Sequence, residues 1–241
     1  MNQLFISICG IVFSFQSVFI NCDHNLKLSK KEGVHLFILS GQSNMSRLKT
    51  KKFFTPLVEE AFGKENTAVV KIAQGGQPIR RWYKDWRPAS GEFEPDRGDI
   101  YKVLIDSIKN TVQGKKLASV TFIWMQGEND AKLSHGEVYK ESLLGLMEQF
   151  KKDLNINNMN TIIGRLSDYD LENKKCPHWS MIRKIQMEIA EENNNTEWVN
   201  TDDLNDATAN KKPNALHYSK EGYVILGKRY ADLAIKMIRK E

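Results

Sequence analysis

Apolar runs of strand length alternate with segments of helical periodicity from Val34 to the end of the chain. Short runs rich in Val, Ile and Phe predict strands; they cover residues 34–40, 67–73, 118–125, 161–166 and 197–204. Apolar residues spaced three or four apart predict helices; these cover residues 53–62, 99–112, 137–154, 178–193 and 219–240.

This alternation predicts an α/β fold, because each crossover between parallel strands needs a connection of helix length. We expect a three-layer α/β/α domain over residues 33–241, with a mainly parallel five-stranded sheet. The longest irregular stretch is residues 74–98. In a compact domain, a loop of this length is usually functional.

The first residues of the chain have the pattern of an export signal. Residues 4–20 form a hydrophobic run somewhat short for a membrane span, and polar residues follow it. We therefore expect residues 1–22 to be a signal peptide and the protein to be secreted or periplasmic. An uncleaved anchor and a cell-surface lipoprotein modified at Cys22 are the alternatives, although the residues before Cys22 make a poor lipobox.

Composition and charge narrow the classes of function. The chain is 41% hydrophobic and 27% charged, as is usual for globular proteins. Its net charge of +5 is spread among acidic residues without long single-sign blocks, so it does not by itself indicate nucleic-acid binding. Of three cysteines, two lie in or beside the apolar run, and Cys176 alone cannot form a disulfide framework or a cysteine metal site.

Polar clusters follow each predicted strand. They read SGQSNMS, AQGGQPIRRW, MQGENDA, RLSDYD and TDDLNDATANKKPNALHYS. Because ligands bind beyond the carboxyl ends of strands in open α/β sheets, these clusters are expected to meet at one edge. Arg165 and Asp168, in the fourth cluster, are interpreted as ion-paired scaffold.

Ser43 is the candidate nucleophile, because the first strand breaks there into a tight turn that would hold its hydroxyl clear of the sheet. A serine nucleophile needs a base. Of the five histidines, His217 lies in the final loop just before the last helix, where it can reach over the sheet edge.

Four blocks, GQSNM, GGQPI, WMQGENDA and LHYSKEGY, resemble those of the SGNH hydrolase superfamily, whose fold is flavodoxin-like. Among its branches, the chain is most similar to sialate O-acetylesterase-like and acetylxylan esterase-like carbohydrate esterases. The resemblance runs from about Val34 to Tyr230. It implies a serine esterase that removes O-acetyl groups from a carbohydrate through an acyl-enzyme, without cofactor or metal.

The resemblance also implies donors for the tetrahedral oxyanion. They are the backbone N–H of Ser43, a backbone N–H of Gly75 or Gly76, and the side-chain amide of Asn129. Gln126 is an alternative to Asn129. Glycine suits these loop positions because the backbone must approach the substrate closely.

One departure concerns the acid that supports the histidine. The superfamily usually has D-x-x-H, whereas Asn214 occupies that aspartate position here. We hypothesise a Ser43–His217–Glu128 triad with Asn214 as an auxiliary residue that orients the ring. Asp202 and Asp203 are the reserve acids, and a purely structural Glu128 that braces the serine turn is the alternative.

Candidate substrate-binding residues are Gln42, Asn44, Arg80 and Trp82. The last two belong to a loop rich in aromatic and basic residues, which would suit a sugar, although its tryptophans could instead cover the core. A non-catalytic carbohydrate-binding protein and a lipolytic esterase or thioesterase are the rival functions. An export signal disfavours nucleic acid as a partner, and no membrane partner is expected beyond a possible signal or lipid anchor.

Overall fold

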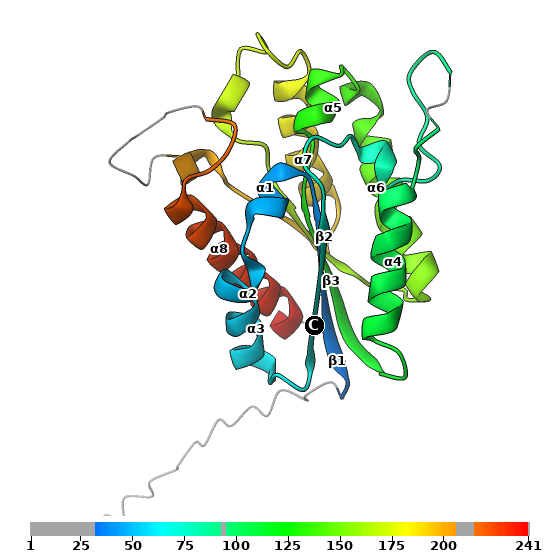
Figure 1. Cartoon of the computed structure of the whole chain (residues 1–241), viewed down its shortest axis with the longest axis vertical. Helices are drawn as coiled ribbons and strands as arrows, with labels where there is room; N and C mark the ends of the chain where they lie inside the picture. Colours follow the sequence, from blue (N-terminus) through cyan, green and yellow to red (C-terminus); the bar gives the residue numbers. More distant parts are fainter. Residues whose placement is uncertain (1–31, 93–94, 206–214, 241) are drawn as a thin grey trace, which may run out of the picture. The chain divides into compact units, whose positions relative to one another are not determined.

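The computed structural model describes residues 32–92, 95–205 and 215–240. Its centre is a five-stranded sheet in which every neighbouring pair is parallel, in the order β2-β1-β3-β4-β5 (Figure 1). The strands are β1 (Val34–Gly41), β2 (Thr67–Ala73), β3 (Leu117–Met125), β4 (Asn160–Gly164) and β5 (Thr196–Val199). The predicted α/β architecture is confirmed.

Helices cover both faces of the sheet. They are α1 (Ser43–Arg47), α2 (Thr50–Phe53), α3 (Thr55–Phe62), α4 (Asp99–Thr111), α5 (Glu128–Lys132), α6 (Gly136–Leu154), α7 (Trp179–Glu192) and α8 (Lys220–Lys240). The short 3-10 turns are η1 (Ile79–Arg81), η2 (Asp168–Asp170) and η3 (Asp202–Asn205). Figure 1 shows α4 and α6 on one side of the sheet and α3 and α8 on the other.

Both faces of the central strand β1 carry apolar side chains, although the strand also contains His35 and Ser40. Leu36 and Ile38 pack into the core beneath α4, α6 and α7, whereas Phe37 and Leu39 pack into the core beneath α3 and α8. A parallel sheet is buried on both faces, so both sets of side chains must be apolar. Each side chain of this size contributes about 1.5–3 kcal/mol when fully buried.

Two predicted elements differ from the structure. The predicted strand at 197–204 ends at Val199, and its second half forms η3. The predicted helix at 53–62 is two helices in the structure: Phe53 ends α2, and a separate helix, α3, begins at Thr55 with Pro56 in its first turn. Proline suits a helix start because its missing N–H would have no partner there.

The end of β1 depends on Gly41. Its φ of +136° is rarely adopted by other residues, and a Cβ there would clash with the carbonyl oxygen of Met125 on β3. The next residue, Gln42, donates its backbone N–H to the same carbonyl at 2.9 Å. This close packing ends the strand and begins α1 at Ser43.

The expected export signal, residues 1–22, lies outside the described residues. None of the described helices combines the length and apolar character that a membrane span requires.

Candidate active site

The structure brings Ser43 and His217 together. Ser43 is the first residue of α1, immediately beyond β1, and His217 lies in the loop before α8. The Oγ of Ser43 lies 3.1 Å from the Nε2 of His217. This distance allows a hydrogen bond between a serine nucleophile and its base.

The surroundings of His217 keep it ready to accept a proton. Burial lowers the pKa of its imidazole below the ordinary value of 6.5, and the nearby charge of Arg47 lowers it further. The ring is therefore mostly neutral at pH 7, which is the form a general base requires.

A hollow of ≈ 540 Å³ opens over Ser43 and His217. Its walls come from the segments that follow β1, β2, β3 and β4 and from the loop before α8. They comprise Gln42, Ser43, Arg47, Gly75, Gly76, Glu128, Asn129, Lys132, Tyr169, Lys175, Cys176, Leu216 and His217. All five sequence clusters thus contribute to this hollow, including the serine turn.

Two of the predicted oxyanion donors belong to backbone close to the Ser43 side chain. The N–H of Ser43, at the start of a helix, has no acceptor within that helix. A Cβ built on Gly75 would lie 3.6 Å from the Cβ of Ser43, so the glycine backbone is close to the nucleophile. Asn129 donates from Nδ2 to the carbonyl oxygen of Gly76 at 2.9 Å and so ties this loop to α5.

The alternative donor, Gln126, is not placed at the hollow. It is fully buried and absent from the wall described above. Its Nε2 donates to the carbonyl oxygen of Gln77, to Oε1 of Gln42 and to a carboxylate oxygen of Asp130. Gln126 therefore braces the loops around the site.

Glu128 lies at the hollow but does not bond to the histidine. Its Oε1 accepts a hydrogen bond from Nδ2 of Asn44 at 3.1 Å, and its Oε2 has no partner among the described residues. Burial raises its pKa to about 7. No hydrogen bond or ion pair between the described side chains of Glu128 and His217 closes a triad, so the triad stays a prediction.

The other acids considered lie elsewhere. Asn214 falls outside the described residues. Asp202 is bound by Arg165 and Arg183, each at 2.6 Å, and Asp203 is paired with Arg229. The arginine partners outweigh burial and lower the pKa of Asp202, so this carboxylate serves the scaffold around β5.

Of the four predicted substrate-binding residues, only Gln42 lines the hollow. Its Oε1 accepts the backbone N–H of Asn129 at 3.2 Å. Asn44 is buried below the site, Arg80 is paired with Asp96 at 2.8 Å, and Trp82 is fully buried with its indole N–H donated to Ser40. The alternative interpretation of Trp82 as a core residue fits its position.

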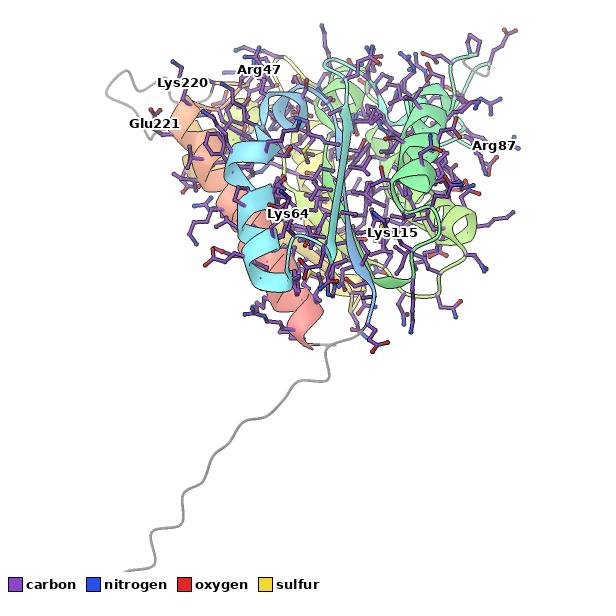
Figure 2. All side chains as sticks on the ribbon, turned by 60° about the horizontal axis from the view of Figure 1, so that its bottom comes forward. Arg47, Lys64, Arg87, Lys115, Lys220 and Glu221 are labelled. Carbon is purple, nitrogen blue, oxygen red and sulfur yellow. The ribbon has the colours of Figure 1, made fainter. Side chains whose placement is uncertain are left out.

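Sequence reasoning missed three cations in the wall: Arg47, Lys132 and Lys175. Arg47 follows Ser43 by four residues and Lys132 follows Glu128 by four, a spacing that puts side chains on one helix face. That signal was readable only if α1 and α5 had been recognised as helices. Figure 2 shows Arg47 at the end of the molecule where Lys220 and Glu221 begin α8.

Lys175 is held by a compact turn after β4. The carboxylate of Asp170 accepts the backbone N–H of Lys175 at 2.8 Å and of Cys176 at 2.7 Å. The Nζ of Lys175 lies 4.8 Å from the ring centroid of Tyr169. No carboxylate forms an ion pair with Arg47, Lys132 or Lys175 among the described residues, so their charges are available to a ligand.

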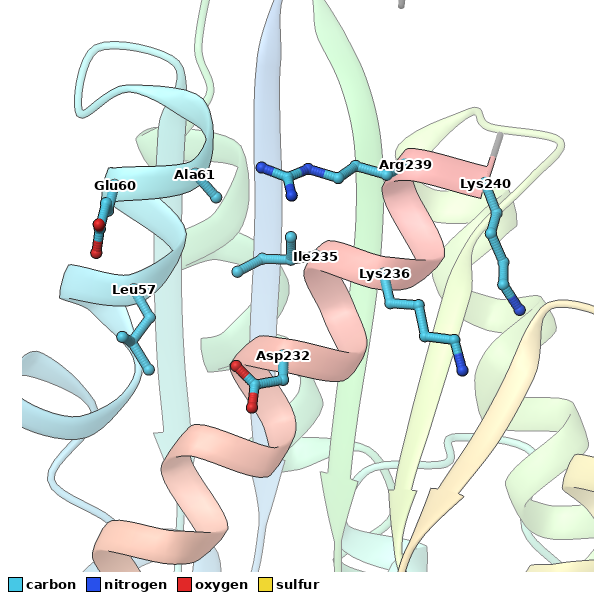
Figure 3. Close-up of a pocket in the computed structure, with 8 residues that line it drawn as sticks. All are labelled: Leu57, Glu60, Ala61, Asp232, Ile235, Lys236, Arg239 and Lys240. Carbon is cyan, nitrogen blue, oxygen red and sulfur yellow. The ribbon is translucent and has the colours of Figure 1, made fainter.

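A second hollow, of ≈ 740 Å³, lies between α3 and the last turns of α8. Figure 3 shows Leu57 and Ala61 of α3 facing Ile235 of α8, with Arg239 nearby. Its wall contains neither a serine nor a histidine. Within the described parts of the chain, no group of three or more His, Cys, Asp or Glu side chains is arranged to hold a metal ion.

The sequence profile of one protein family matches residues 46–236. Its description reads carbohydrate esterase, sialic acid-specific acetylesterase. The chain belongs to this family. The predicted membership of the carbohydrate esterases is confirmed, and the protein is a carboxylic ester hydrolase of the carbohydrate acetylesterase type.

Solved structures share the fold of this esterase. A protein from Arabidopsis thaliana has a TM-score of 0.62 at 16% identity, over 85% of this chain and 98% of that one. A carbohydrate acetylesterase from Xanthomonas citri has a TM-score of 0.61 at 15% identity, over 85% of this chain and 56% of that one. The esterase thus spans little more than half the length of the Xanthomonas protein.

The structure of NanS is also similar, with a TM-score of 0.57 at 15% identity, over 86% of this chain and 98% of that one. At these identities the likeness establishes the fold of the esterase. A search of curated proteins gives no match to the esterase.

Proposed function

We propose that this esterase hydrolyses O-acetyl esters of an acidic sugar, with Ser43 as nucleophile and His217 as general base. The observation that carries the proposal is the 3.1 Å contact between Ser43 Oγ and His217 Nε2, on the wall of a hollow that also carries three cations. Sialic acid, which the family description names, is a sugar of this kind.

The reaction follows from that contact. The Oγ of Ser43 attacks the acetyl carbonyl carbon while Nε2 of His217 takes the hydroxyl proton. The tetrahedral intermediate collapses to an acetyl-serine, and the histidine returns the proton to the departing sugar hydroxyl. A water molecule, deprotonated by His217, then attacks the acetyl-serine. The bond from the acetyl group to Oγ breaks, acetate leaves, and His217 returns the proton to Oγ of Ser43.

The N–H groups of Ser43 and Gly75 are the proposed oxyanion donors, because both lie at the nucleophile. One such donor typically lowers the barrier by about 3 kcal/mol. Asn129 supports them by holding Gly76 and has a second amide hydrogen for the oxyanion. The ionised form of Glu128 is the proposed acid that favours the imidazolium electrostatically.

The charge of the hollow supports an anionic substrate. Arg47, Lys132 and Lys175 line it, and its single described carboxyl group, Glu128, has a pKa raised to about 7 by burial. A substrate carboxylate would gain charge-assisted hydrogen bonds from these cations. This lining suits a long acyl chain poorly, which disfavours a lipolytic esterase.

Acetate release tests the proposal. Purified protein is incubated with O-acetylated sialic acids, acetylated xylan and other acetylated glycans, and free acetate is measured. We expect the highest kcat/KM for the acidic sugars and loss of acetate release in Ser43→Ala. Ser46→Ala, an exposed serine on the same helix α1, is the matched control and should behave like the parent protein.

Preference for neutral xylan would contradict the acidic substrate but leave the esterase mechanism standing. Undiminished acetate release by Ser43→Ala would contradict the mechanism itself.

We also propose that the esterase acts outside the cytoplasm, because residues 4–20 have the composition of an export signal. Expression with and without residues 1–22, followed by cell fractionation and amino-terminal sequencing, tests this. A full-length chain that stays in the cytoplasm uncleaved would contradict it.

A further inference from the structure

Asn44 occupies a buried position between the two halves of the proposed catalytic pair. Its side chain is 2% exposed and belongs to no wall of the hollow. It directly follows Ser43 in α1. A polar side chain in such a place must find partners inside the protein, because a buried unpaired amide costs about 1–3 kcal/mol.

The partners of Asn44 come from three separate parts of the fold. Its Nδ2 donates to Oε1 of Glu128 at 3.1 Å and to the carbonyl oxygen of Leu216 at 3.1 Å. Its Oδ1 accepts the hydroxyl hydrogen of Tyr223, on α8, at 2.9 Å. All the main hydrogen-bonding positions of the amide are therefore used.

These bonds connect the serine to the histidine by a route other than their own contact. Leu216 immediately precedes His217, so its carbonyl fixes the backbone that carries the imidazole. Glu128 lies on the first turn of α5 and has no described bond to His217. The shortest described hydrogen-bonded connection from this carboxyl group to the histidine loop runs through Asn44.

We propose that Asn44 is a positioning residue: it holds His217 at proton-transfer distance from Ser43, and Glu128 acts on the histidine through Asn44 without touching it. This inference rests on the proposed function, since it assigns how the Ser43–His217 pair is kept in place. It replaces the expected role of Asn44 in binding substrate.

The chain offers a matched control in Asn205. It too is buried, and its Nδ2 donates to a backbone carbonyl of the same loop, that of Ala215, at 2.7 Å. It has no described bond to α1 or to Glu128. Asn205→Ala therefore tests loop anchoring alone, whereas Asn44→Ala also cuts the link to the serine helix and to the carboxyl group.

The experiment compares Asn44→Ala, Asn44→Asp and Asn205→Ala with the parent protein on p-nitrophenyl acetate. Asn44→Asp keeps the shape and the acceptor for Tyr223 but loses the amide N–H donors, and it places a second carboxyl group within hydrogen-bond distance of Glu128. We expect both Asn44 variants to lose about 10- to 100-fold in kcat, as misplacement of a catalytic group does, with KM changed less than about twofold. Asn205→Ala should lose less than about threefold.

A pH profile gives a readout that packing alone would not move. Asn44 donates to the ionised form of Glu128, so its loss should raise the pKa of that carboxyl group further. Other ionisable groups face this cluster from each neighbouring element: Asp130 on α5, Arg47 on α1, Tyr139 on α6, Cys176, Tyr218, and Tyr223 and Tyr230 on α8. In Asn44→Ala, the acidic limb of kcat/KM should move to higher pH, while in Asn205→Ala it should stay in place.

Equal losses in Asn44→Ala and Asn205→Ala, a loss confined to KM, or parent-like kinetics in Asn44→Asp would each overturn the inference. Failure of both Asn44 variants to fold, judged by thermal melting, would assign the residue to stability alone and overturn it as well. Ser43→Ala distinguishes failure of the proposed function from failure of the Asn44 inference. If that variant keeps its activity, the proposed function is wrong regardless of the result for Asn44.

Discussion

The hydroxyl of Ser43 and the imidazole of His217 lie 3.1 Å apart, although 174 positions of sequence separate them. Ser43 begins α1 after the first strand, and His217 lies in the last loop before α8. Their contact is a property of the topology, because all strands run parallel and place their carboxyl ends at one edge.

Replacement of the base is the most direct test of this contact. In His217→Ala the hydroxyl of Ser43 loses its proton acceptor, so kcat on p-nitrophenyl acetate should fall by about 10²- to 10⁴-fold. The melting temperature should change little, since the ring is partly exposed. Retention of more than a tenth of the activity would rule out His217 as the general base.

The pH dependence of kcat/KM distinguishes the contribution of Glu128. Its pKa is raised to about 7 by burial, so the carboxyl group is half ionised near that pH and mostly ionised above it. If the ionised form supports the imidazolium, the rate of the parent protein should fall as pH drops through about 7. In Glu128→Gln this limb should move below 6.5, where the lowered pKa of His217 alone governs it. An unchanged midpoint would show that Glu128 does not govern the rate.

Stability should respond to the same carboxyl group. Its folded pKa of about 7 lies above the ordinary 4.5, so the folded state holds the proton more tightly than the unfolded state does. The parent protein should therefore lose stability between pH 4.5 and 8, on the order of 3 kcal/mol relative to Glu128→Gln. Urea unfolding of both proteins at the two pH values measures this. Equal changes in the two proteins would contradict it.

We expect Lys175 to bind the negatively charged group of the substrate. In Lys175→Met, kcat/KM for an acetylated acidic sugar should fall by about 10- to 100-fold, the equivalent of one charge-assisted hydrogen bond. Activity on p-nitrophenyl acetate should stay within about twofold. Lys174→Met removes the neighbouring charge, which lies outside the wall and pairs with Glu172, and should leave both activities intact. Equal effects of the two variants would point to long-range charge instead of a specific contact.

The turn at the end of β1 should tolerate no side chain at Gly41. Gly41→Ala forces a Cβ against the Met125 carbonyl, and we expect a loss of more than about 3 kcal/mol or failure to fold. Gly114→Ala is the control, because its φ of +70° is also left-handed but nothing lies within 4 Å of the added Cβ. It should cost about 1–2 kcal/mol. Similar unfolding free energies for the two variants would show that the clash is relieved.

Much of the fold could be predicted because a parallel sheet leaves a plain trace in sequence. The run 34–40 is apolar at five of its seven positions and presents apolar side chains on both faces. The five strand positions and the confirmed architecture follow from such runs. The helices α1 and α5 were missed because five residues are too few to display a helical period. Because these two helices were not predicted, Arg47 and Lys132 were not predicted to face the site.

The direction in which a polar side chain points could not be predicted from the sequence either. Asn44 and Gln42 flank Ser43 and look alike in sequence, yet one is buried away from the hollow and the other lines it. The choice depends on Tyr223 and Leu216, which lie more than 170 positions away. Local pattern carries no record of such distant partners, so only the assembled fold distinguishes the two residues.

The turn around Asp170 has a wider consequence. The carboxylate of Asp170 accepts the backbone N–H groups of residues 174–176 and so holds the segment in a turn. The described part of this segment pairs with no strand of the sheet. Lys175, the cation proposed above to recognise a substrate carboxylate, therefore lies on a stretch of polypeptide separate from Ser43 and His217. The segment around Asp170 could therefore be replaced, by natural variation or by engineering, to change the preferred sugar. Such a replacement would leave Ser43, His217 and the strand register unchanged.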